Sequence, residues 1–163
     1  MKTATLHRTV RLTARTSAVL YTSAQIAQAL RRPTPSAWRP LYLAFVAAHA
    51  IHFGFVARFA QRTHGQALFP GGRNMDDVGG WTTVLGIYAL FLTLATVGWI
   101  AAPADAHQGR RPGVAATTII GAMFVSFYLN QVPRSRWYAV PGATIAAAVL
   151  ANIVSRTVAG RAS

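Results

Sequence analysis

Residues 41–60 read LYLAFVAAHAIHFGFVARFA, an apolar run that is interrupted by two histidines and, near its end, by one arginine. A helix of about 20 residues rises about 30 Å, which matches the hydrocarbon thickness of a lipid bilayer. A run of this length and composition therefore predicts a membrane-spanning α-helix.

Four other segments extend this pattern to the rest of the chain. Their approximate bounds are 13–30, 81–102, 114–132 and 138–155. The first of them is the most polar, because it contains Gln25 and Gln28, which hydrocarbon accepts only where they face other helices. An interfacial amphipathic helix is the alternative for that segment. The predicted fold class is an all-α membrane protein, a bundle of about five transmembrane helices.

The connections between these segments are short and rich in arginine, proline and glycine. The second span is preceded by Trp38, Arg39 and Pro40. An aromatic residue, a cation and a proline are common where a helix enters the membrane from its interface. The basic residues divide almost evenly between the two sides of a five-span bundle, so the positive-inside rule leaves the orientation open. The predicted organisation is a basic N-terminal tail, a single transmembrane domain and a C-terminal tail, over residues 1–12, 13–156 and 157–163 respectively.

The composition agrees with a membrane location. Charged residues make up 12% of the chain and hydrophobic residues 53%, whereas about one quarter of a typical soluble domain is charged. The formal charge is +13, but the basic residues lie between apolar segments and not on one polar face, so we expect no nucleic-acid partner. The chain has no cysteine, which excludes disulfides and thiolate metal sites.

His49 and His52 are the residues of this chain that point most directly to chemistry. Ionisable side chains at membrane depth are costly and usually functional. A spacing of three places both imidazoles on one face of the helix. Neutral imidazole is a common axial ligand of b-type haem iron, so the pair is predicted to bind the cofactor and its metal. Because both project from one backbone, at most one of them ligates a given iron.

The second axial ligand is not identified by the sequence. His7, His64 and His107 lie in predicted tails and connections, and no histidine follows residue 107. Met123 offers a thioether. A metal site or a proton relay is another use of the pair, and the structural alternative is that both histidines hydrogen-bond to Ser, Thr or Gln of the first segment.

Three stretches resemble bacterial members of the ferric reductase-like transmembrane group. They are TARTSAVLYTSAQIAQALRR at 13–32, RPLYLAFVAAHAIHFGFVARFA at 39–60 and FYLNQVPRSRWYAV at 127–140. Members of this group have an Arg-Thr-Ser first helix, a helix with His-x-x-His and a late Asn-x-x-Pro-Arg turn. The resemblance extends over roughly residues 11 to 156. The chain departs from it at 110–124, where the group has a Leu-His pair and RRPGVAATTIIGAMF has no histidine.

The resemblance implies that the helices hold b-type haem and pass electrons across a bacterial inner membrane. It implies His49 and His52 as haem ligands and Arg15 as a partner of a haem propionate. The chain has no flavin or NAD(P) site and no complete active site, so the electrons are expected to come from a partner subunit or from quinone. The alternative is a cofactor-free structural or accessory subunit of a larger membrane complex.

Overall fold

The computed structural model describes residues 3–30, 35–62, 87–88, 90–91, 93–94, 113–133 and 135–161. Within these ranges the chain is helical, which confirms the all-α prediction. The elements are α1 (Thr3–Ala29), α2 (Pro35–Arg62), α4 (Val114–Leu129), the 3₁₀ turn η1 (Arg136–Tyr138) and α5 (Ala139–Arg161). Most of the predicted span at 81–102 lies outside the described residues, as do the predicted connection at 63–80 and the three acidic residues.

The helices differ in length from the predicted spans. Helix α1 begins at Thr3 and not at residue 13, so most of the predicted N-terminal tail is helical. This part of the chain contains neither Gly nor Pro, and the Thr9 and Thr13 hydroxyls bond to carbonyls four residues earlier. Helix α5 likewise continues through the predicted C-terminal tail to Arg161.

Helix α2 also begins earlier than predicted, at Pro35, and Pro40 lies inside it. Pro35 occupies the first position, where a missing amide costs little because the amides there have no partner within the helix, whereas Pro40 is in the second turn and removes one hydrogen bond of the helix. Trp38, which we expected at the membrane interface, is instead buried, with 2% of its surface exposed. It belongs to the hydrophobic core.

Two helical stretches are long and apolar enough to cross a membrane. They are Ala37–Phe59 in α2 and Arg136–Val158 in η1 and α5, while α4 is apolar but shorter. The described residues therefore contain two membrane-capable helices of the five predicted spans. Helix α1 is more polar, since it carries Arg8, Arg11 and Arg15 in addition to its glutamines.

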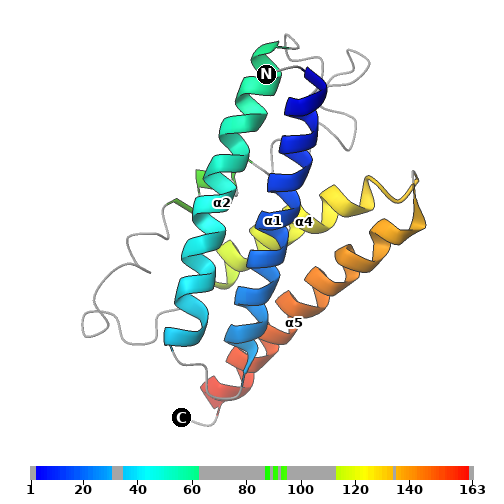
Figure 1. Ribbon diagram of the computed structural model, residues 1–163. Helices are drawn as coiled ribbons and strands as arrows, with labels where there is room; N and C mark the ends of the chain where they lie inside the picture. The colour runs from blue at the N-terminus through cyan, green and yellow to red at the C-terminus, as the bar shows by residue number, and fades with distance from the viewer. Residues whose placement is uncertain are drawn as a thin grey trace.

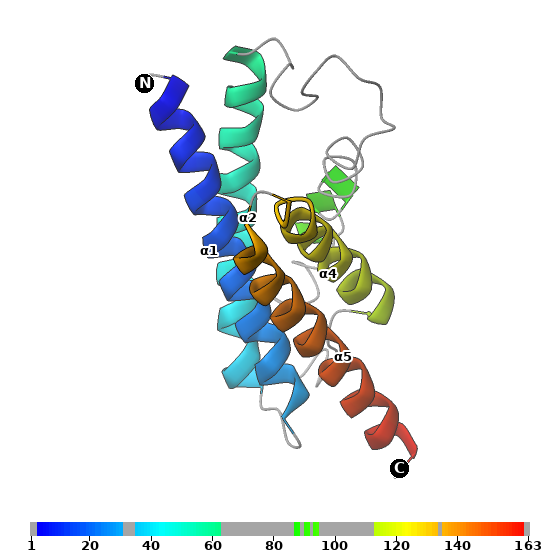
Figure 2. The same cartoon turned by 90° about the vertical axis from the view of Figure 1, so that its right-hand side faces the viewer.

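The helices form two antiparallel pairs that cross obliquely (Figures 1 and 2). In the first pair, the rings of Tyr21 in α1 and Phe45 in α2 lie 5.1 Å apart. In the second pair, α4 and α5 approach closely at Gly121, where an added Cβ would lie 2.9 Å from Val149 Cγ2. Helix α5 runs in the same direction as α1, because Tyr138, just before its start, contacts Arg15, and Arg156, near its end, contacts Gln28.

A cluster of aromatic rings joins the two pairs and forms the centre of the core. Tyr21, Phe45 and Phe124 come from α1, α2 and α4, and their ring centroids lie between 5.1 and 6.0 Å apart. The Tyr21 hydroxyl also donates a hydrogen bond to the Thr117 carbonyl of α4. His49 lies beside this cluster, so the core directly determines its surroundings.

Candidate functional site: the histidine pair of α2

His49 and His52 lie one turn apart on α2, as their spacing predicted. Their ring centroids are 6.1 Å apart and the ring planes are inclined by 30°. The pair is near the middle of the membrane-capable stretch Ala37–Phe59. The two imidazoles differ in their surroundings.

His49 is enclosed by aromatic rings, and 1% of its surface is exposed. The ring centroids of Phe45, Phe53 and Phe124 lie 5.2, 5.0 and 5.6 Å from its own. Neither of its ring nitrogens has a hydrogen-bond partner among the described residues. Leaving a buried polar group without a partner costs about 1–3 kcal/mol, so these two nitrogens are the least satisfied feature of the histidine pair.

His52 is oriented by a residue of the neighbouring helix. Its Nδ1 lies 3.1 Å from the Thr13 hydroxyl oxygen in α1. That hydroxyl also lies 2.9 Å from the Thr9 carbonyl and 3.1 Å from the Val10 carbonyl, so its single proton points to its own helix. The oxygen then accepts a hydrogen bond from Nδ1–H. A neutral imidazole with Nδ1 protonated has its lone pair on Nε2, the arrangement found in many metal-binding histidines.

The contact between His52 and Thr13 is also the kind that the structural alternative predicts, a hydrogen bond to a Thr of the first segment. His49 makes no such bond among the described residues. The two readings of the sequence therefore divide between the two histidines: His52 has a polar partner on α1, and His49 has aromatic neighbours only.

The other residues that the sequence singled out lie elsewhere. Arg15 is exposed and hydrogen-bonds through Nη2 to the Tyr138 hydroxyl, at 3.3 Å, on the α5 side of α1. Met123 is buried in the hydrophobic core. His7 lies in α1, where its ring packs 5.6 Å from that of Phe59. His64, His107 and the acidic residues Asp76, Asp77 and Asp105 are outside the described residues.

The sequence reasoning missed a second polar cluster, which joins α1 to α5. The Asn152 side-chain amide donates to the Gln25 carbonyl oxygen and, at 3.4 Å, to that of Gln28. Arg156 donates to Asn152 Oδ1 at 3.0 Å and to Gln28 Oε1 at 2.9 Å. Gln25, Gln28 and Asn152 are fully buried. The signal in the sequence is the pair Asn152 and Arg156, which are four residues apart on an otherwise apolar helix.

Among the described residues, no three His, Cys, Asp or Glu side chains come together to hold a metal ion. Comparison of the chain with known protein families, with curated proteins and with solved structures finds no match.

Proposed function

We propose that this chain is a small multi-pass membrane protein, similar to ferric reductase-like membrane components, whose α2 histidine pair binds b-type haem. The proposal has two parts, a location in the membrane and a cofactor. One observation carries the cofactor part: the two ring nitrogens of His49 are buried and have no partner within the described chain.

The surface and the direction of the helices support the membrane part. Large apolar side chains on α1 and α5 are more than half exposed, and an apolar surface of this kind is typical of contact with lipid or with another protein. They include Val19, Ile26, Leu150, Val154 and Val158. Since α5 is parallel to α1, and each is antiparallel to its partner, α2 and α4 run in the same direction. With α2 and α4 both crossing the bilayer, the chain would return between them, and the predicted span at 81–102 would supply that return.

The chemistry of the pair supports the cofactor part. Haem iron requires one or two axial ligands from the protein, because the porphyrin supplies the others. In b-type haem the axial ligand of the iron is commonly the imidazole of a histidine. His49 and His52 each have one ring nitrogen that could ligate the iron. Apolar rings around His49 provide the low-polarity surroundings in which a porphyrin is stable. The unpartnered nitrogens of His49 and the apolar rings around it therefore support the proposal of haem.

Each residue would have a distinct role. His49 would ligate iron, or His52 would do so through Nε2, with Thr13 fixing the orientation of that ring. The haem would supply one-electron transfer. Electrons would come from a partner subunit or from the quinone pool, since the chain carries no nucleotide-binding motif. Arg15 as the partner of a propionate has less support, because its guanidinium hydrogen-bonds to Tyr138 on the α5 side of α1.

The membrane part is tested by alkaline carbonate extraction of cells that express the chain. We expect the protein to remain in the membrane pellet and to be released by detergent. Recovery of folded, monomeric protein in the carbonate supernatant would contradict the membrane location.

The cofactor part is tested by the absorption spectrum of protein purified in detergent from cells supplied with a haem precursor. We expect a Soret band and a reducible b-type spectrum. His49→Ala should remove most of the absorption if His49 is the ligand, and added imidazole should restore it. His7→Ala is the matched control, because it removes a helical histidine outside the pair. A colourless wild-type protein would refute haem binding, and a wild-type spectrum in the double variant His49→Ala/His52→Ala would refute ligation by the pair.

The same purification tests the alternative function, a cofactor-free accessory subunit. In that case the isolated chain is colourless and co-purifies with a stoichiometric membrane partner. The polar cluster around Asn152 then serves only to hold α5 against α1, and the histidine pair serves only packing and the hydrogen bond between His52 and Thr13.

A further inference from the structure

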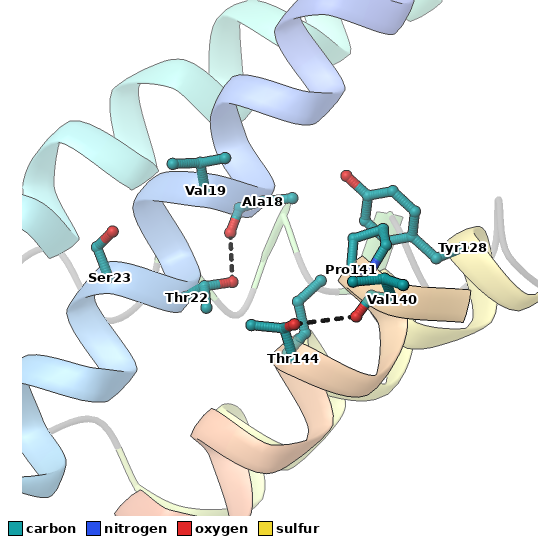
Figure 3. Close-up of a pocket in the computed structure, with 9 residues that line it drawn as sticks. Ala18, Val19, Thr22, Ser23, Tyr128, Val140, Pro141 and Thr144 are labelled. Carbon is teal, nitrogen blue, oxygen red and sulfur yellow. Dashed lines mark hydrogen bonds between the residues drawn. The ribbon is translucent and has the colours of Figure 1, made fainter. Parts of the chain in front are cut away.

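A groove of about 350 Å³ lies between α1 and α5, away from the histidine pair (Figure 3). Ala18 and Thr22 of α1 form one wall, Val140 and Thr144 of α5 form the other, and Tyr128 of α4 closes one end. The volume is within the usual range of about 300–1,000 Å³ for small-molecule sites. The groove is open on one side, so its occupant would also contact the surroundings of the bundle.

The walls of the groove present mainly hydrocarbon. The Thr22 hydroxyl donates to the Ala18 carbonyl at 2.7 Å, and the Thr144 hydroxyl donates to the Val140 carbonyl at 2.9 Å (Figure 3). Both protons are thus used within their own helices. An aliphatic chain suits such a surface, because it has no polar group that would need a hydrogen-bond partner in the groove.

The end of the groove near the start of α5 is polar and positively charged. Arg15 lies one turn before Ala18 on α1, and its guanidinium donates to the Tyr138 hydroxyl. The Tyr138 ring lies 6.5 Å from that of Tyr128, which lines the groove. A guanidinium has five N–H donors. Within the part of the chain that the structure describes, every charged residue is basic. Charge complementarity therefore favours an anion at this end.

The same end of the groove has the features of a membrane interface. Trp137, which precedes Tyr138, is 83% exposed. Exposed tryptophan beside arginine is typical of the level at which lipid head groups lie. The apolar groove thus begins at the predicted head-group level and continues along α1 and α5 towards the bilayer centre.

We infer that the groove is a binding site for an anionic phospholipid, with an acyl chain between α1 and α5 and the phosphate at Arg15 and Tyr138. The inference rests on the membrane part of the proposed function and is independent of haem. Arg15 provides the charge, Tyr138 adds a hydroxyl donor, and the two back-bonded threonines keep the walls apolar.

The experiment is native mass spectrometry of the full chain in detergent, titrated with phosphatidylglycerol or with phosphatidylcholine of the same acyl chains. We expect one phosphatidylglycerol to bind in preference to phosphatidylcholine. Arg15→Gln should lower the phosphatidylglycerol affinity about fivefold, the factor expected for one basic residue near an anionic lipid surface. Arg11→Gln is the matched control, because it removes the same charge from an exposed position one turn earlier.

A second pair of variants tests the groove itself. Thr144→Phe places a ring in the groove and should abolish binding of the single lipid. Thr157→Phe makes the same change at an exposed threonine of α5 with the same kind of backbone hydrogen bond, and it should bind as the wild type does. Thermal unfolding of each variant verifies that it is folded.

Three outcomes would overturn the inference. They are equal binding of the two lipids, equal losses in Arg11→Gln and Arg15→Gln, and occupation of the groove by a quinone or by a second copy of the chain. The first would show that the charge of the head group has no effect on binding, and the second would show that only the net charge of the chain attracts lipid. The location of the protein is measured separately by carbonate extraction, so failure of the lipid test leaves the membrane proposal intact.

Discussion

Replacing Asn152 by leucine should destabilise the bundle more than any other single polar substitution on α5. Asn152 is fully buried, and its side chain contacts Gln25 on α1 and Arg156 on its own helix. Leucine has a similar volume, so the variant removes hydrogen bonds without leaving a large cavity. The loss then reports on the polar contacts and not on packing.

The magnitude follows from the contacts. An interhelical hydrogen bond in a membrane protein contributes about 0.6 kcal/mol on average and about 1.7 kcal/mol at most. The substitution also leaves the Gln25 amide buried, and an unsatisfied buried group costs about 1–3 kcal/mol. We therefore expect the free energy of unfolding to fall by about 1–3 kcal/mol, measured by titration with sodium dodecyl sulfate in mixed micelles.

A double-mutant cycle isolates this interaction. Gln25→Leu combined with Asn152→Leu removes both partners, so the double variant should lose less stability than the sum of the single variants, by at least about 0.5 kcal/mol. Thr157→Ala, at an exposed position of the same helix, should change stability by less than about 0.5 kcal/mol. Additive single losses, or an Asn152→Leu variant as stable as Thr157→Ala, would refute the reasoning.

Two further predictions concern contacts between the helices. Gly121→Ala should destabilise the protein by about 1–3 kcal/mol in the same titration, because the new Cβ would lie 2.9 Å from Val149 Cγ2. Gly54→Ala is its control: the added Cβ meets nothing within 4 Å, so the better helix propensity of alanine should stabilise the protein by up to about 1 kcal/mol. Tyr21→Phe should cost about 1 kcal/mol, because it removes the hydrogen bond to the Thr117 carbonyl; unchanged stability would show that this bond contributes nothing.

Hydrophobic patterning predicted the existence of α2, α4 and α5 well, because long apolar runs leave few alternatives to helix. It predicted their ends poorly. The N-terminal part of α1 and the C-terminal part of α5 are polar or basic. The apolar segments in the sequence are therefore shorter than the helices that contain them. The composition around Pro40 predicts that the helix begins there. Instead, α2 begins at Pro35 and continues through Pro40 in its second turn.

The sequence also placed His49 and His52 on one face, since helical spacing alone determines that. It could not tell the two residues apart. The difference arises from tertiary contacts: Thr13, which is 39 positions away from His52 in the chain, hydrogen-bonds to that ring, while Phe124 packs on His49. Similarly, Asn152 is unremarkable in an alanine-rich segment until Gln25 is brought beside it.

The parallel course of α1 and α5 has a consequence for the way the protein meets its environment. Thr3 and Arg161 lie at opposite ends of the bundle (Figure 1). In a bilayer these two ends would face different compartments. A soluble domain fused after Arg161 and another fused before Thr3 would therefore never share a solvent, and any protein that recognises both ends would itself have to pass through the lipid.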